Sequence, residues 1–250
     1  MRLKNKLALI TGATSGIGLA TAELFVENGA DVILIGRDKS KLSSISKKFG
    51  SKALIIKADM NDIVSLKNAR EEIEKKYGVK SVDVYFANAG IAYSTPLAEA
   101  DLASYDALMD TNVKSLFFSM KEFNPLFSDG ASIILNSAWL NTVGAPGFSV
   151  LAASKAAVRS FARSWSAELL ERKIRVNCVS PGAIDTPIFE LEGGTKEDVS
   201  RAKNELASKI PVGRMGAATE IAETVLFLAS DESKYILGAE IMVDGGFSQL

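Results

Sequence analysis

The chain has 250 residues, of which 47% are hydrophobic and 24% are charged, and its formal net charge is −1. This length and composition fit one α/β domain with a substantial core, and the near-neutral charge excludes the strong field that attracts nucleic acid or anionic membranes. Histidine is absent, which excludes histidine–metal clusters and Ser-His-Asp triads, so we expect no metal site.

Short apolar runs alternate with longer amphipathic stretches along the whole chain. The runs predict strands near residues 6–11, 31–36, 53–57, 82–86, 132–136, 174–179 and 240–243. The stretches predict helices near residues 16–28, 40–49, 62–77, 102–122, 149–171 and 219–230. Apolar strands separated by helices indicate a parallel sheet covered on both faces, so we predict one doubly wound α/β domain over residues 1–250 with seven parallel strands.

The beginning of the chain is basic and then apolar, as a signal peptide is. Its apolar core spans only Leu7 to Ile10, and a glycine turn follows at once. We therefore interpret this segment as the first strand and expect a cytoplasmic protein. No run of about 18 apolar residues exists, so no membrane-spanning segment is expected. The single cysteine, Cys178, lies in an apolar run, which favours a buried structural thiol.

A glycine loop joins the first predicted strand to the first predicted helix. Gly12, Gly16 and Gly18 follow Thr11 with the spacing Gly-x-x-x-Gly-x-Gly. Glycines there permit a sharp turn, a close approach of the backbone to a pyrophosphate and tight packing of helix on strand. The start of the helix then offers free N–H groups to phosphates. By itself such a loop also fits an ordinary strand-to-helix turn.

Further motifs follow the predicted strands or lie in the helices between them. They are Asp59-Met60, Asn88-Ala89-Gly90, Asn112, Lys155, the segment Pro181-Gly182-Ala183-Ile184-Asp185-Thr186, and Val243-Asp244-Gly245-Gly246. Together with the glycine loop, this set resembles the short-chain dehydrogenase/reductase family along essentially the whole chain.

The resemblance implies a Rossmann-like fold, hydride transfer between a nicotinamide cofactor and a ketone or secondary alcohol, and a homotetramer. It also implies which residues bind the cofactor. These are Gly12, Thr14, Ser15, Gly16, Ile17, Gly18, Arg37, Asp59, Met60, Asn88, Ala89, Gly90, Lys155, Pro181, Gly182, Ile184 and Thr186.

The end of the second strand indicates which cofactor is bound. An acidic residue there would bind a ribose 2′-hydroxyl and favour NAD(H). The chain instead has Gly36, which leaves room for a 2′-phosphate, and Arg37, which can pair with that phosphate. We therefore expect NADP(H) to be favoured over NAD(H). Two alternatives stay open: Arg37 is simply solvated, or Asp38 faces the ribose.

The catalytic motif of the family is altered in this chain. The family places a tyrosine four residues before its lysine and a serine thirteen residues before the tyrosine. Counting back from Lys155 gives Leu151 and Ala138, neither of which has a hydroxyl group. Asn112 and Lys155 are retained, whereas positions 138 and 151 have no hydroxyl group. This combination predicts a catalytically impaired or re-engineered active site. The alternatives are proton donation by Ser137 or Tyr93, and a non-catalytic NADP(H)-binding regulatory protein.

Three expectations concern surfaces. The candidate substrate pocket is mostly apolar and comprises Tyr93, Leu140, Phe148 and Ile188. The polar segment near 188–209 is predicted to be a lid over this pocket, or else a surface helix. Two helices have apolar residues on more than one face, which together with the family resemblance predicts a homotetramer. These residues are Leu116, Phe117, Phe118, Met120, Phe123, Val158, Phe161 and Trp165.

Overall fold

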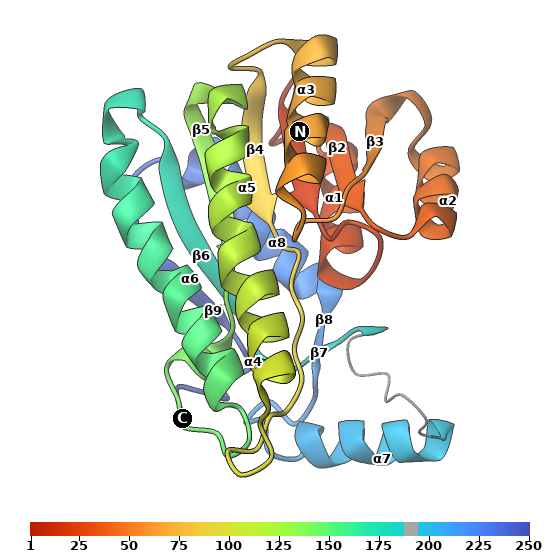
Figure 1. The fold of residues 1–250 in the computed structure, drawn as a ribbon, viewed down its shortest axis with the longest axis vertical. Helices are drawn as coiled ribbons and strands as arrows, with labels where there is room; N and C mark the ends of the chain where they lie inside the picture. Colours follow the sequence, from red (N-terminus) through yellow and green to blue (C-terminus); the bar gives the residue numbers. More distant parts are fainter. Residues whose placement is uncertain (188–194) are drawn as a thin grey trace.

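The computed structural model describes residues 1–187 and 195–250, and its centre is a seven-stranded parallel sheet (Figure 1). The strand order is β3-β2-β1-β4-β5-β6-β9. The strands are β1 Leu7–Thr11, β2 Asp31–Gly36, β3 Ala53–Lys57, β4 Val82–Ala87, β5 Phe127–Asn136, β6 Arg175–Pro181 and β9 Glu240–Val243. The order reverses between β1 and β4, which is where doubly wound sheets bind ligands. The predicted fold class is confirmed.

Helices cover both faces of the sheet (Figure 1). They are α1 Gly16–Glu27, α2 Lys39–Phe49, α3 Ile63–Tyr77, α4 Leu102–Met109, α5 Ser115–Phe123, α6 Ser149–Glu168, α7 Lys196–Ala207 and α8 Ala218–Ala229. Along β2, Ile33 and Ile35 pack in the core that contains α3, α5 and α6, whereas Val32 and Leu34 pack in the core that contains α1, α2 and α8. Within the described residues, no helix is long and apolar enough to cross a membrane.

Strand β5 begins at Phe127, so its predicted start near 132 is wrong. The pairing with β4 shifts register, because Val82 pairs with Phe127 whereas Val84 pairs with Ser132. The intervening residues include Gly130, whose φ of +83° lies in the left-handed region. A polar, glycine-containing stretch resembles a turn in sequence, but here it forms an irregular part of the strand.

The helix predicted over 102–122 is interrupted. A π-helical turn, Asp110–Lys114, separates α4 from α5 and carries the buried Asn112. Single π-helical turns are rare and frequently mark functional sites. The interruption therefore bears directly on the position of a predicted catalytic residue.

The predicted lid segment divides into two parts. Residues 188–194, which include the pocket candidate Ile188, lie outside the described residues. After them, Thr195 and Asp198 form a capping box that starts α7. Figure 1 shows α7 at the lower edge of the molecule, near the short strands β7 (Ile184–Asp185) and β8 (Gly216–Ala217). Lys203 Nζ donates to Asp185 Oδ1 at 2.6 Å. The role of this segment as a lid stays a prediction.

Candidate functional site

The loop between β1 and α1 has the conformation that a phosphate-binding loop needs. Gly12 and Gly16 have φ values of +64° and +52°, which favour glycine. A Cβ atom at Gly18 would lie 2.3 Å from the Gly12 carbonyl oxygen, so only glycine fits there. The Ser15 side chain caps none of the N–H groups at the start of α1. These groups are therefore available to a phosphate, and the loop fits the pyrophosphate of a dinucleotide.

Asn88 ties this loop to the end of β4. Its Nδ2 donates to the carbonyl oxygens of Thr11, at 3.1 Å, and Gly12, at 3.2 Å. In return, Thr11 Oγ1 accepts from the backbone N–H groups of Asn88, at 3.1 Å, and Ala89, at 3.2 Å. Asn136 Nδ2 donates to Asn88 Oδ1 at 2.9 Å and extends this network to β5. Asn88 and Ala89 are among the predicted cofactor-binding residues, whereas Thr11 and Asn136 are not, since their only signal in the sequence is a polar residue at the end of an apolar strand.

At the end of β2, the glycine is required by its neighbour. A Cβ atom at Gly36 would lie 2.5 Å from Thr14 Cγ2, so the Thr14 methyl group occupies the space that a side chain at position 36 would need. The room for a 2′-phosphate near Gly36 stays a prediction. Asp38 is the N-cap of α2 and accepts from the backbone N–H groups of Ser40, at 2.8 Å, and Lys41, at 3.1 Å. Arg37 is exposed, and it is the cationic side chain that directly follows β2.

The hydrogen bonds of Asp38 also affect its acidity. The Ser40 hydroxyl donates to its carboxylate, and this contact, followed by the Lys41 N–H, lowers the Asp38 pKa from its ordinary value. The carboxylate is thus engaged as a helix cap.

Two predicted cofactor-binding residues come shortly after the neighbouring strand β3. Asp59 is exposed, and its Oδ1 accepts from the Asn61 N–H at 3.0 Å. Met60 is buried.

The segment after β6 packs against both the glycine loop and the end of the chain. A Cβ atom at Gly16 would lie 3.3 Å from Thr186 Cβ, which places Thr186 directly beside the loop. At Gly182, a Cβ atom would lie 2.6 Å from the Asp244 Cα atom. Pro181 and Ile184 are buried. The structure thus brings the segment Pro181–Thr186 to the glycine loop across the carboxyl ends of the strands.

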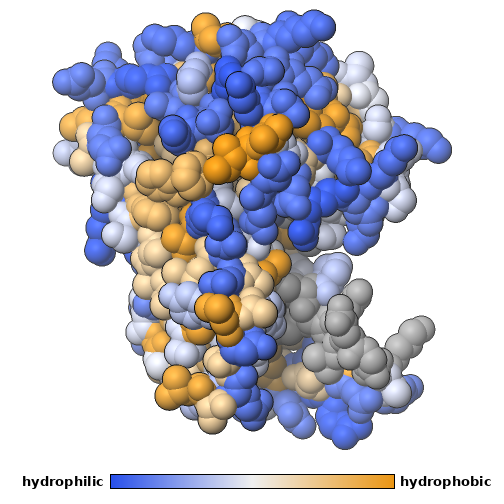
Figure 2. All heavy atoms as spheres, viewed as in Figure 1, coloured by the Kyte–Doolittle hydropathy of each residue, from blue (hydrophilic) through white to orange (hydrophobic). Residues whose placement is uncertain are grey.

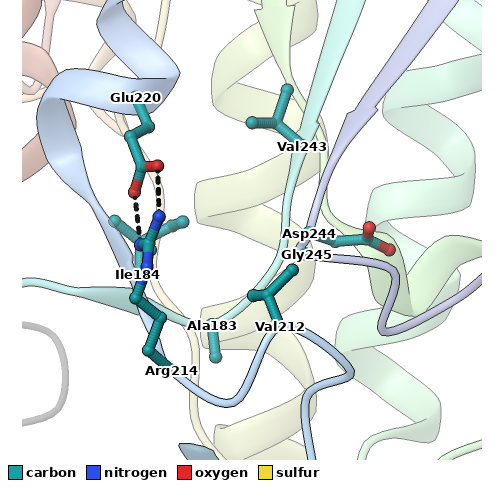
Figure 3. Close-up of a pocket in the computed structure, with 9 residues that line it drawn as sticks. Ala183, Ile184, Val212, Arg214, Glu220, Val243, Asp244 and Gly245 are labelled. Atoms are coloured by element: carbon teal, nitrogen blue, oxygen red, sulfur yellow. Dashed lines mark hydrogen bonds and ion pairs between the residues drawn. The ribbon is translucent and has the colours of Figure 1, made fainter.

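A cavity of about 150 Å³ lies behind this segment (Figure 3). It is lined by Ala183, Ile184, Val212, Arg214, Gly216, Glu220, Val243, Asp244 and Gly245. Pockets for drug-sized ligands usually enclose about 300–1,000 Å³. This cavity is smaller than that range, and Tyr93, Leu140 and Phe148 of the predicted substrate pocket are not among its lining residues.

A largely exposed ion pair lines this cavity. Arg214 donates from Nη1 and Nη2 to the two carboxylate oxygens of Glu220, each at 2.8 Å (Figure 3). Glu220 Oε2 also accepts from the Ala217 N–H at 2.8 Å, which anchors β8 at the start of α8. The hydrogen bonds from Arg214, followed by the one from Ala217, lower the Glu220 pKa to about 2. Neither residue is part of a sequence motif, because the two are brought together only by the turn into α8.

Asn112 and Lys155 meet beside Gly90. A Cβ atom at Gly90 would lie 3.0 Å from Asn112 Oδ1 and 3.5 Å from Lys155 Nζ. Asn112 Nδ2 donates to the Ile91 carbonyl at 3.0 Å and to Ser154 Oγ at 3.1 Å, while its Oδ1 accepts from the Ile91 N–H at 3.0 Å. These contacts position the Asn112 side chain at the π-helical turn.

Lys155 points from α6 to the end of β5. Its Nζ donates to the Asn136 carbonyl oxygen at 2.9 Å. Burial lowers the Lys155 pKa from 10.5 to about 8. Desolvation disfavours the ammonium form, which is why the pKa lies below its ordinary value.

Leu151 lies in a third apolar cluster, next to this polar group. Its side chain is 3% exposed and packs with Leu108 and Leu140. Half-buried residues complete the cluster, namely Ile91, Ala92, Ala138, Trp139, Val143, Ala145, Phe148, Val150 and Ala152. The structure thus brings together Ala138, Leu140, Phe148 and Leu151.

The hydroxyl groups near this cluster are engaged with backbone carbonyls. Ser137 Oγ donates to the Lys155 carbonyl at 2.9 Å, and Ser154 Oγ donates to the Leu151 carbonyl at 2.7 Å. Tyr93 Oη donates to the Ser104 carbonyl at 2.8 Å, so its hydroxyl contacts α4. Burial, and secondarily Asp101, raises the Tyr93 pKa. Tyr93 is 37% exposed and is not part of the apolar cluster.

Comparison with known proteins identifies the class. Residues 12–248 match the family described as enoyl-(acyl carrier protein) reductase. The chain is 35% identical to the NADP-dependent (R)-specific alcohol dehydrogenase of Lentilactobacillus kefiri, over 99% of this chain and 98% of the relative. A solved short-chain dehydrogenase/reductase of Serratia marcescens matches with a TM-score of 0.89 at 30% identity, over 99% of this chain and 100% of that chain. A metagenomic blue fluorescent protein in complex with NADPH matches with a TM-score of 0.88 at 31% identity, over the same shares.

The chain therefore belongs to the short-chain dehydrogenase/reductase family, whose members are nicotinamide-dependent oxidoreductases.

Proposed function

We propose that this chain is an NADP(H)-binding oxidoreductase with impaired activity on ordinary ketones and secondary alcohols. One observation carries the proposal. Leu151 is 3% exposed and packs against Leu108 and Leu140, at the position where the family resemblance places a proton-donating tyrosine. An aliphatic side chain has no proton to donate in any rotamer.

The chemistry requires a donor at this place. When NADPH is bound, its nicotinamide supplies a hydride, and negative charge develops on the carbonyl oxygen that accepts it. A hydrogen-bond donor must stabilise that charge and supply a proton. Ala138 and Leu151 have no hydroxyl, and the hydroxyls of Ser137, Ser154 and Tyr93 donate to backbone carbonyls.

The preference for NADP(H) is supported by the end of β2. Arg37 is exposed there, whereas the carboxylate of Asp38 is engaged as the N-cap of α2. A guanidinium group pairs well with a 2′-phosphate, while an engaged carboxylate does not compete for a 2′-hydroxyl. The L. kefiri relative is NADP-dependent, and the blue fluorescent protein is in complex with NADPH, which agrees with this choice.

The substrate class follows from the cluster around Leu151. Leu140, Phe148 and Ala138 contribute apolar surface, so a hydrophobic ketone or secondary alcohol suits this region best. The same lack of a proton donor also favours a second candidate function. The chain would then be a non-catalytic regulatory protein that binds NADP(H) without turnover.

A homotetramer is the third part of the proposal. Leu116, Met120 and Phe123 face the core, but Phe117 is 43% exposed and lies 5.9 Å from Phe161, measured between ring centroids. Figure 2 shows pale and orange side chains over the middle of α5 and α6, whereas hydrophilic side chains cover the upper end of the molecule. Light scattering of the parent chain and of Phe117→Ser tests this part. A monomeric parent at micromolar concentration would refute it.

The central test compares four chains: the parent, Leu151→Tyr, Ala138→Ser and the double variant. We expect all four to bind NADPH, and the parent to reduce a panel of hydrophobic ketones about 10²–10⁴ times more slowly than the double variant. The double variant should exceed the combined gains of the single variants, because the two groups act as a unit. A parent as active as the double variant would refute the impairment. If the double variant is also inactive, the regulatory function is favoured.

A further inference from the structure

A polar atom at the centre of the site has no partner. Asn136 is the last residue of β5, and its side-chain oxygen Oδ1 is buried without a hydrogen-bond partner among the described residues. A buried acceptor without a donor is unfavourable, and native structures rarely retain one without a reason. The motif analysis did not name Asn136, so its role is open.

The identity of the unpaired atom follows from its neighbours. Asn88 Nδ2 donates to two backbone carbonyls, those of Thr11 and Gly12, which can only accept. The other end of the Asn88 amide is therefore its oxygen, and Asn136 must direct its NH₂ group toward that oxygen, at 2.9 Å. This orientation leaves the Asn136 oxygen as the free atom. The free atom of Asn136 is therefore a hydrogen-bond acceptor, and its missing partner must be a hydrogen-bond donor.

The strand register places this acceptor in line with the cofactor-binding residues. Ile10 pairs with Phe86, and Phe86 pairs with Ile134. All three pack in the core beside α1 and α8. Two residues further along the chain are Gly12 and Asn88, just beyond the ends of β1 and β4, and Asn136, the last residue of β5. The hydrogen bond between the side chains of Asn88 and Asn136 places both at the carboxyl ends of the strands, beside the glycine loop.

The position across the sheet indicates which half of the cofactor is near. Arg37 follows β2, and in the strand order β2-β1-β4-β5 three spacings separate it from Asn136. At about 4.8 Å per spacing this is roughly 14 Å, which an extended dinucleotide spans. The backbone carbonyl of Asn136 also accepts from Lys155 Nζ, at 2.9 Å. Asn136 therefore lies at the end of the site opposite to Arg37.

We propose that Asn136 is a cofactor-positioning residue whose Oδ1 accepts a hydrogen bond from the nicotinamide–ribose half of NADP(H). The donor is an N–H of the nicotinamide carboxamide or an O–H of the adjoining ribose. This inference rests on the proposed binding of NADP(H). It adds a contact that orients the reactive end of the cofactor from the β5 side, next to the contact expected from Lys155.

The test compares two ligands, NADPH and adenosine 2′,5′-bisphosphate, which lacks the nicotinamide half. Calorimetric titration measures both affinities for the parent chain and for Asn136→Leu. We expect Asn136→Leu to weaken NADPH about tenfold more than it weakens the bisphosphate, which corresponds to one lost hydrogen bond, because the lost donation to Asn88 affects both ligands alike. Asn136→Ala serves as the second variant if the leucine side chain prevents folding, which thermal melting reveals.

A matched control must lie outside the catalytic and cofactor-binding residues, which excludes Ser137→Ala. Because Ser137 contacts the backbone of Lys155, the variant that is expected to keep the parent ratio of the two affinities is instead Ser132→Ala, which lies on the same strand as Asn136 and whose hydroxyl donates to the Leu228 carbonyl at 2.7 Å, away from the site. An equal loss for both ligands in Asn136→Leu would mean that Asn136 only supports Asn88 and the glycine loop. That result would overturn the inference, as would unchanged NADPH affinity.

Two further outcomes separate this inference from the proposed function. A parent chain that binds neither ligand refutes the proposed function and the inference together, whereas a parent that binds both while the variant matches it refutes the inference alone.

The 3-acetylpyridine analogue of NADP⁺, which has no carboxamide N–H, distinguishes the two donors. If the carboxamide is the donor, the parent binds this analogue more weakly than NADP⁺ and Asn136→Leu removes the difference. If the ribose is the donor, Asn136→Leu weakens both equally.

Discussion

The glycine-loop region and the Leu151 region lie side by side but differ in how their polar groups are used. Around the loop, polar groups are directed outward: N–H groups at the start of α1 are uncapped, and Arg37 is exposed. Around Leu151, the hydroxyls of Ser137 and Ser154 are bonded to backbone carbonyls and the remaining surface is apolar. The first region offers hydrogen-bond donors to a polar ligand, whereas Leu151 and Ala138 in the second region have no hydroxyl group.

This difference has a structural cause. The loop depends on backbone conformation, through the positive φ angles of Gly12 and Gly16 and the hydrogen bonds of Asn88. Proton donation would depend on individual side chains, which change without any change in the backbone. Cofactor binding and catalysis are therefore separable in this fold, and the following predictions test that separation.

The largest expected effect is on stability. Leu151→Ala removes a side chain that is 3% exposed, so the free energy of unfolding should fall by about 3 kcal/mol. Affinity for NADPH should stay within about twofold of the parent, because the glycine loop does not contact Leu151. Chemical denaturation and a binding titration measure the two quantities. The control is Leu97→Ala, since Leu97 is 88% exposed. A large loss of affinity in Leu151→Ala would show that the regions are coupled.

Gly18→Ala disrupts the other region. The new Cβ would lie 2.3 Å from the Gly12 carbonyl oxygen and 2.7 Å from Asn88 Nδ2, so the loop must shift. We expect NADPH affinity to fall by about 100-fold, or about 2.7 kcal/mol. Fluorescence titration of NADPH measures the loss. Gly144→Ala should behave like the parent, since nothing lies within 4 Å of its Cβ position. Unchanged affinity in Gly18→Ala would exclude the loop as the phosphate site.

Arg37→Ala should have a smaller and more selective effect. Loss of one charge-assisted contact with the 2′-phosphate should weaken NADPH about tenfold and leave NADH unchanged. Titration of both cofactors measures the change, and the exposed Lys47→Ala on α2 is the control for net charge. If the parent binds both cofactors equally, the assignment of Arg37 to the phosphate is wrong.

The smallest expected effect is a dependence on pH. The Lys155 pKa is lowered to about 8, so above that pH the side chain is neutral and donates weaker hydrogen bonds. NADPH affinity should therefore fall roughly threefold as the pH rises from about 7 to about 9.

Stability should change in the opposite direction. The unfolded chain holds the Lys155 proton up to its ordinary pKa of 10.5, whereas the folded chain releases it near 8, so stability rises between these values. Titration and melting at several pH values measure both trends, and Lys155→Met should remove both. A pH-independent affinity of the parent would contradict the assigned contact.

The sequence alone was sufficient for the fold and for most of the cofactor loop. The alternation of apolar runs and amphipathic stretches requires elements that bury one face each, and the glycines define a turn that other residues cannot form. It also predicted a buried Cys178, which is 0% exposed and whose pKa burial raises to about 12. These properties depend on neighbours along the chain.

Tertiary structure decided the rest, because the decisive contacts join residues that are distant in the chain. Whether Thr14 fills the space beside Gly36 depends on how the glycine loop packs against β2. The β7–β8 pair consists of strands of two residues each, too short to show a period in the sequence. The free oxygen of Asn136 appears only when β1, β4 and β5 align, since its orientation is set by two carbonyls more than 120 residues away.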